Sequence, residues 1–330
     1  MNPTDSITPD VRATENPVET PFVSIITAVL NARTFIRDVI QNIWDQRGVA
    51  VEHIVLDGGS TDGTREILAE YPHLRLIAEA DRGAHDALNK GVAVARGEII
   101  GFVNADDLCG ANLLAIAAER FQGEPELDAL LTRSYVFVSD GGVARTVLAH
   151  PLCRQGGFDL RDLMYGIPCL NARFFRRKLF AGAEPFDLRF RLGADRHFLI
   201  RLAFAGIKGG TLDGPGYFYR SHPASAKLDP GRKAAAAIGR EHMTIATSLL
   251  PLSGPAQRRT LRDWLAYESA RALCRGDASP PPAAARVSML AGLPRGLQGK
   301  FRWIRHRRRT VRTTSLPPPP ILASCPTEHR

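Results

Sequence analysis

The amino-acid sequence predicts an α/β protein with a mainly parallel sheet flanked by helices and a helical extension at the C-terminal end. Short apolar runs rich in β-branched residues alternate with segments whose apolar residues recur at helical spacing, and short polar loops join them. This alternation indicates βαβ crossovers, which place successive strands parallel in one sheet. With 330 residues, 44% hydrophobic and 23% charged, the chain is long enough for one large core and a smaller lobe.

The first half of the chain carries the clearest pattern. FVSIITAV is a typical buried strand, and the following helix presents Phe35, Ile36, Val39, Ile40, Ile43 and Trp44 on one face. In chain order, the pattern predicts strands at 22–29, 51–57, 74–79 and 97–107, and helices at 33–46, 64–71 and 84–95. Parallel strands gather ligands at their carboxyl ends, so the polar residues that follow these strands should face one crevice.

The pattern weakens after residue 125. It predicts a strand or strand pair at 127–140, a helix at 195–206, a strand with a turn at 212–222, and one or two helices within 232–275. We expect a disordered lead-in over 1–20, a main domain over 21–228 and a helical extension over 229–278. Residues 279–330 should hold a linker, a basic amphipathic segment and a disordered proline-rich tail.

Composition excludes several classes of protein. No apolar run approaches the ~20 residues that a membrane-spanning helix needs, and the N-terminal residues do not resemble a secretory signal. The five cysteines show no CxxC spacing, which argues against a disulfide framework and favours a reducing, cytoplasmic location. The net charge of +9 is local, because residues 286–312 hold nine basic residues and no acid. The other 34 basic residues equal the 34 acidic ones.

Two aspartates follow the fourth predicted strand. Asp106 and Asp107 are costly to leave unpaired at a buried strand end, and a divalent cation with oxygen ligands would relieve that cost. The alternative is that they cap the helix that begins near Gly110. The loop from Asp57 to Gly63 offers backbone amides and a carboxylate at another strand end, but it matches neither a P-loop nor GxGxxG. Its alternative is a plain turn with a helix cap.

Four ordered segments together resemble glycosyltransferase family 2, which has the GT-A nucleotide-sugar-binding fold. They are VSIITAVLNA, IVLDGGSTDGT, DRGAHDALNKGVAVARGEIIGFVNADD and FRLGADRHFLIRLAFAG. The resemblance covers about residues 22 to 225. Within the family, the DGGS form and GAHDALNKG are most similar to bacterial enzymes that build surface polysaccharide or lipopolysaccharide.

The resemblance implies roles for individual residues. Thr27 and Asn31 would line the nucleobase pocket, and Asp57 would contact the uracil or ribose. Asp106 would touch the ribose or diphosphate and belong to the metal motif, in which Asp107 would ligate Mn²⁺ or Mg²⁺. Asp195 matches the general base, although a carboxylate there could also cap the helix that follows.

The chain departs from the family pattern at three places. Gly58 follows Asp57 where many relatives have a second acid, and Asn104 replaces an aspartate that often opens the metal motif. Leu88 stands where many relatives have an arginine, so a basic donor contact could have moved to Lys90, which could equally be a solvated helix residue. Asp81 lies near the expected crevice edge as a further donor contact.

His222 is a candidate late ligand for the metal or diphosphate, although a lone loop histidine is more often structural. The chemistry expected of this set is inverting, metal-dependent transfer of a sugar from a nucleotide-sugar donor to a glycan or lipid-linked acceptor in cell-surface polysaccharide synthesis. A carboxylate must take the acceptor proton, and a cation must stabilise the leaving diphosphate. The alternative is a partner subunit that binds nucleotide sugars without turnover.

The basic segment at 295–312 places arginines around an apolar stripe that includes Leu297, Phe301 and Ile304. This pattern is typical of a helix that lies on an anionic membrane surface, so the protein could be peripheral on the inner membrane face. A flexible solvated tail is an equally weighted alternative. Nucleic-acid binding is the less favoured one.

Overall fold

A computed structural model describes residues 20–140, 143–150, 155–182, 184–222, 231–275, 297 and 317–320. The first half contains β1 (Val23–Val29), α1 (Ile36–Trp44), β2 (Val51–Asp57), α2 (Thr64–Ala69), β3 (Arg75–Ala78), α3 (Ala84–Val94), β4 (Ile99–Phe102), β5 (Leu108–Cys109) and α4 (Leu113–Gly123). The second half contains β6 (Ala129–Asp140), β7 (Val143–His150), α5 (Leu160–Tyr165), β8 (Arg173–Arg176), α6 (Ala194–Phe204), β9 (Gly209–Ser221), α7 (Gly231–Leu249) and α8 (Pro255–Arg275). Short 3₁₀ turns lie at Gln155–Gly157, Arg177–Phe180 and Leu250–Leu252.

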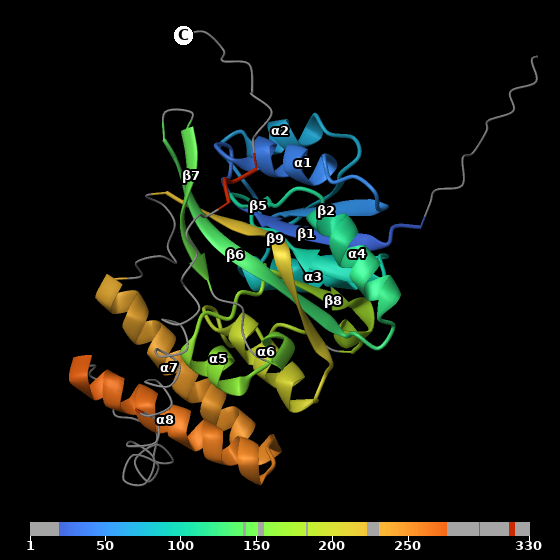
Figure 1. Cartoon of the computed structure of the whole chain (residues 1–330). Helices are drawn as coiled ribbons and strands as arrows, with labels where there is room; N and C mark the ends of the chain where they lie inside the picture. The colour runs from blue at the N-terminus through green and yellow to red at the C-terminus, as the bar shows by residue number, and fades with distance from the viewer. Residues whose placement is uncertain are drawn as a thin grey trace, which may run out of the picture.

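The strands form one mixed sheet in the order β3-β2-β1-β4-β8-β6-β9-β5, with β7 paired to β6 (Figure 1). β3, β2, β1 and β4 run parallel, as the alternation of strands and helices predicts. The second half is mixed, because β8 runs antiparallel to both β4 and β6, whereas β6 and β9 are parallel. The predicted strand at 97–107 ends at Phe102, and β5 forms a separate short strand against β9.

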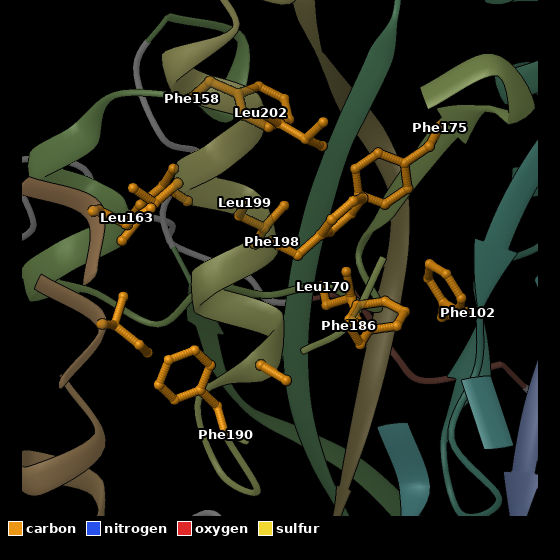
Figure 2. Close-up of a cluster of buried hydrophobic side chains, with 14 of the residues drawn as sticks. Phe102, Phe158, Leu163, Leu170, Phe175, Phe186, Phe190, Phe198, Leu199 and Leu202 are labelled. Atoms are coloured by element: carbon orange, nitrogen blue, oxygen red, sulfur yellow. The ribbon is translucent and has the colours of Figure 1, made fainter. Parts of the chain in front are cut away.

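Helices cover both faces of the sheet. The apolar faces of α1, α2 and α4 pack together with one side of β1 and β2 in one core cluster. A second cluster joins α3, α5 and α6 to the other side and continues into α7 and α8. Figure 2 shows its aromatic centre, where Phe102 of β4 and Phe175 of β8 meet Phe186 and Phe198. The predicted helical extension is therefore packed on the same core as the sheet.

None of the helices in the described ranges is long and apolar enough to span a membrane. Within the predicted proline-rich tail, residues 317–320 contact the sheet, because the Thr146 hydroxyl donates a 2.6 Å hydrogen bond to the Pro317 carbonyl and Pro319 is buried. The lead-in at 1–19, the linker and all of the basic segment except Leu297 lie outside the described residues.

A buried histidine lies between β1 and β2. His53 Nε2 and the Thr27 hydroxyl are 3.0 Å apart, and the other ring nitrogen of His53 has no hydrogen-bond partner. Burial lowers the pKa of His53 from 6.5 to about 3, and the charge of His73 adds to this effect. The folded protein therefore resists protonation of a ring that the unfolded chain protonates readily.

This arrangement predicts a loss of stability in mild acid. Because the pKa of His53 is lower in the folded state, its contribution is complete above pH 6.5 and is lost as the pH falls towards 3. The double variant Thr27→Val/His53→Leu removes both polar partners. Between about pH 7 and about pH 5, we expect the wild-type free energy of unfolding to fall by about 2 kcal/mol more than that of the variant. Urea unfolding at the two pH values measures this, and parallel pH profiles would contradict it.

Candidate functional site

The predicted crevice residues meet at the carboxyl ends of neighbouring strands. Val29 at the end of β1 pairs with Asp57 at the end of β2, and Ile26 of β1 pairs with Phe102 at the end of β4. Asn31, the loop after Asp57 and the segment Asn104–Asp107 therefore leave the sheet at one edge. This is the convergence that a parallel sheet imposes on them.

Asp107 is buried and fully hydrogen-bonded within the protein. Its side chain is 2% exposed. One carboxylate oxygen accepts from the Tyr217 hydroxyl at 2.8 Å and from the Asn104 amide at 2.7 Å, and the other accepts from the Arg220 backbone N–H at 2.8 Å. Burial raises the pKa of Asp107, and the neighbouring Asp106 charge raises it further, while the three donors oppose the shift. Asp107 thus ties the β4–β5 segment to β9.

Asp106 lies at the surface of the same segment and meets His222. The Oδ2 atom of Asp106 is 3.0 Å from His222 Nε2, and the two side chains are 33% and 19% exposed. His222 follows β9 directly. A carboxylate and an imidazole from segments more than 100 residues apart are therefore in contact at the sheet edge. We call Asp106 and His222 the acid–histidine pair. No group of three histidine, cysteine or acidic residues suited to a metal occurs in the described part of the chain.

The Arg220 side chain joins the backbone of Asp106 to helix α1. Its Nε donates a 2.8 Å hydrogen bond to the Asp106 carbonyl, and its Nη2 donates at 3.0 Å to Asp38 of α1. The guanidinium lies 4.6 Å from the centre of the Phe35 ring and 4.9 Å from that of Phe137. Such stacking stabilises a buried cation. One signal for Arg220 was present in the sequence, since it lies two residues before His222 and alternate residues of an extended chain share a face.

Asn104 explains one departure from the family pattern. Its amide nitrogen donates to Asp107, and its amide oxygen accepts a 2.9 Å hydrogen bond from Asn171. Its backbone N–H donates to the Tyr217 hydroxyl at 3.0 Å. An aspartate at position 104 would place a second carboxylate against Asp107 and would lose the amide donor. The amide therefore fits this pocket because Asp107 needs a donor there.

The residues at the β1 and β2 ends hold the loop Asp57–Gly63. Asn31 adopts a left-handed backbone (φ 53°), and its side chain accepts from the Thr61 N–H at 2.9 Å while its N–H donates to Ser60 Oγ at 2.8 Å. Asp57 is 1% exposed and accepts from the Ser60 N–H at 3.3 Å. Thr27 has no exposed surface and its hydroxyl contacts His53, and its place in a nucleobase pocket stays a prediction.

Asp81 lies directly against Gly58. A Cβ atom on Gly58 would lie only 2.3 Å from Asp81 Oδ2, so the glycine leaves room for the Asp81 carboxylate. The other oxygen of Asp81 accepts from the Gly83 N–H at 2.8 Å. The loop between β3 and α3 thus brings a carboxylate beside position 58, and the role of Asp81 as a donor contact stays a prediction.

Lys90 is already paired. Its Nζ donates at 2.8 Å to the Ala80 carbonyl and lies 2.6 Å from Glu79 Oε1. The hydrogen bond to Glu79 raises the pKa of Lys90. Lys90 therefore holds the segment that precedes Asp81, and a contact between Lys90 and the donor stays a prediction.

Asp195 lies in the first turn of α6. The N-cap position is Gly193, and Asp195 Oδ1 accepts from the Arg196 N–H at 2.7 Å. Burial raises the pKa of Tyr219, and the charges of Asp107 and Asp195 both contribute to that rise. The role of Asp195 as general base stays a prediction.

Two residues that the sequence did not single out fix the start of α6. Glu241 of α7 accepts the backbone N–H groups of residues 191, 192 and 193 at 3.1, 2.9 and 2.8 Å. The buried Arg196 guanidinium donates to the carbonyls of Leu163, Met164 and Gly166 at the end of α5. Both sets of hydrogen bonds join residues far apart in the sequence, so no local sequence pattern predicts them.

The hydrogen bonds around Asp107 predict that Tyr217→Phe destabilises the protein. The substitution removes a donor from a buried carboxylate, so we expect a loss of about 1–3 kcal/mol in the free energy of unfolding. Tyr71→Phe is the matched control, because its hydroxyl accepts only a 3.4 Å contact from Arg37. Its change should stay within about 0.5 kcal/mol. Equal effects of the two variants in urea unfolding would contradict the anchoring role of Asp107.

Comparisons with known proteins identify the family and the fold of this chain. The model of the family described as Glycosyl transferase family 2 matches residues 24–181. A PGL/p-HBAD biosynthesis glycosyltransferase of Mycobacterium bovis is 36% identical over 189 residues, which cover 55% of this chain and 69% of the relative. An uncharacterised glycosyltransferase of Mycobacterium tuberculosis is 31% identical over 189 residues, covering 56% and 69%.

Among solved structures, S. aureus TarS superposes with a TM-score of 0.55 at 18% identity, over 84% of this chain and 49% of TarS. The chain thus spans about half the length of that protein. The fragment TarS 1–349 gives a TM-score of 0.54 at 19% identity, over 84% of this chain and 80% of the fragment. The structural likeness establishes the fold, and the mycobacterial relatives establish the family. The chain belongs to glycosyltransferase family 2 and is a glycosyltransferase with the GT-A fold.

Proposed function

We propose that this glycosyltransferase moves a sugar, with inversion, from a nucleotide-sugar donor to a hydroxyl of a glycan or lipid-linked acceptor. The observation that carries the proposal is the acid–histidine pair, with Asp106 Oδ2 3.0 Å from His222 Nε2 at the carboxyl edge of the sheet. Two further points support it. S. aureus TarS is known in complex with UDP-GlcNAc, and the mycobacterial relative takes part in PGL/p-HBAD biosynthesis.

The acid–histidine pair fits a divalent cation such as Mn²⁺ or Mg²⁺. It offers one carboxylate and one imidazole that already converge, and such cations commonly take one or two protein carboxylates and fill their other positions with phosphate oxygens and water. When bound, the cation would supply positive charge for the leaving diphosphate. Asp107 has both oxygens occupied by protein donors, so we assign it the role of anchor and give the ligand role to Asp106 and His222.

The remaining residues bind and orient the reactants. Asp81, against Gly58, provides the carboxylate at the donor end of the crevice, and Asn31 and Asp57 hold the loop beneath it. Asp195 accepts the proton of the attacking hydroxyl, since it is a carboxylate in the first turn of α6 whose charge, like that of Asp107, acts on Tyr219. Attack of that hydroxyl on the face opposite the leaving diphosphate inverts the anomeric centre.

The ligand roles of Asp106 and His222 predict the same loss of activity in two variants. Asp106→Ala and His222→Ala should each lower metal-stimulated transfer by about 100-fold or more, since each removes a charge-stabilising contact at the leaving group. Transfer is measured as release of nucleoside diphosphate over a series of Mn²⁺ concentrations. Asp213→Asn is the control, because Asp213 is 69% exposed and pairs with Arg133 at the surface. Full metal stimulation in Asp106→Ala would overturn the assignment.

The base role predicts that Asp195→Asn separates binding from turnover. We expect transfer to fall by about 10²–10⁴-fold, the usual contribution of a general base. Donor affinity, followed by thermal stabilisation with UDP-, GDP- and dTDP-sugars, should stay within a factor of about two, because the amide keeps the shape of the side chain. Loss of donor binding in parallel with turnover would contradict the role.

The contact between Gly58 and Asp81 predicts a donor-binding defect in Gly58→Ala. The added Cβ would displace the Asp81 carboxylate, so the KM for the donor should rise by about tenfold while kcat changes little. Gly123→Ala is the matched control, because a Cβ at that glycine meets nothing within 4 Å. Steady-state kinetics with both variants measure the difference. An unchanged KM in Gly58→Ala would remove Asp81 from the donor site.

A further inference from the structure

Residues 317–320, which we call the proline strap, lie on the edge of the sheet next to the site. The Thr146 hydroxyl of β7 donates a 2.6 Å hydrogen bond to the Pro317 carbonyl, Pro319 is buried and Pro320 is half-buried. Within the described residues, β7 pairs only with β6, so its other edge is open to such a contact. Four prolines suit this place, because they favour an extended backbone with free carbonyl acceptors and no N–H donors.

The strand register places the strap close to the acid–histidine pair. Thr146 of β7 pairs with Phe137 of β6, and Phe137 pairs with Arg220 of β9. Neighbouring strands lie about 4.8 Å apart, so the Cα atoms of Thr146 and Arg220 are about 10 Å apart. The Arg220 guanidinium stacks on Phe137 and binds the Asp106 carbonyl. Figure 1 shows the strap in red, beside β7 and the far end of β9.

We propose that the proline strap is an intramolecular latch that docks on β7 and hinders entry to the site beside it. The docking rests on the hydrogen bond and the burial of Pro319, and the effect on entry rests on the proposed function. The strap forms no strand of the sheet, so its docking can be reversed without unfolding the sheet. A segment of the same chain competes for its docking position at an effective concentration that is typically millimolar, so a small contact can remain docked.

The test of docking uses the full chain and a labelled synthetic peptide of residues 313–330. In the strap variant, Pro317, Pro318, Pro319 and Pro320 are all replaced by serine. The peptide should bind this variant at least about tenfold more tightly than the wild type, in which the chain's own strap occupies the site. Adding Thr146→Val to the strap variant should weaken peptide binding. Thr244→Val, an exposed threonine that bonds only its own helix backbone at Arg240, should leave it unchanged.

The test of hindered entry compares turnover of the same proteins. If the strap is docked nine-tenths of the time, the strap variant should show about a tenfold higher kcat/KM, and added peptide should reverse the gain. Unchanged kcat/KM would overturn the latch, as would equal peptide affinity for variant and wild type. Absence of donor turnover in every protein would instead count against the proposed function, and peptide binding would still decide whether the strap docks.

Discussion

The site depends on one buried charge that must be kept satisfied. Asp107 lies inside the protein, and a carboxylate there is tolerated only while donors replace the water it has lost. Its donors come from Asn104, from the Tyr217 hydroxyl and from the Arg220 backbone, so the β4–β5 segment and β9 cannot move apart independently. Because His222 continues β9 and Asp106 precedes Asp107, the same tie brings the acid–histidine pair together.

Sequence patterns predicted the parts of the fold that depend on local periodicity. The run FVSIITAV and the helix after it follow from spacing, because a fully buried strand and an amphipathic helix each leave a repeating pattern. β5 has two residues and β8 has four, which is too short for any period to appear. The mixed direction of the second half also has no local signal, since it depends on which distant strands pair.

The candidate site divides in the same way. The convergence of Asp106 with the ends of β1 and β2 follows from the rule for parallel sheets, and His222 was singled out only as a lone histidine among polar neighbours. Arg220 could be linked to His222 by its position two residues earlier, but its contact with Asp38, like the contacts of Glu241, comes from other elements and was not predictable. The surroundings of Thr27 were not predictable either. Its strand was predicted well, but whether its side chain faces a ligand or His53 depends on packing across β1 and β2.

The departures from the family pattern are paired changes. Gly58 leaves room that Asp81 fills, and Asn104 supplies a donor that Asp107 uses while accepting from Asn171. Gly58 and Asp81 lie in separate loops, whereas Asn104 bonds both Asp107 in its own segment and the distant Asn171. Substitution of one partner alone would leave either a steric overlap or an unpaired buried polar group.

The long span between the two halves of the site has a consequence for biosynthesis. Tyr217 and His222 reach their carboxylate partners across 110 and 116 residues of intervening chain. Contacts of such high sequence separation close late, because the entropy of ordering the intervening chain must be met first. A nascent chain emerging from the ribosome can therefore complete β1 to β4 early, whereas the acid–histidine pair and the Asp107–Tyr217 hydrogen bond form only after β9 has been synthesised and inserted.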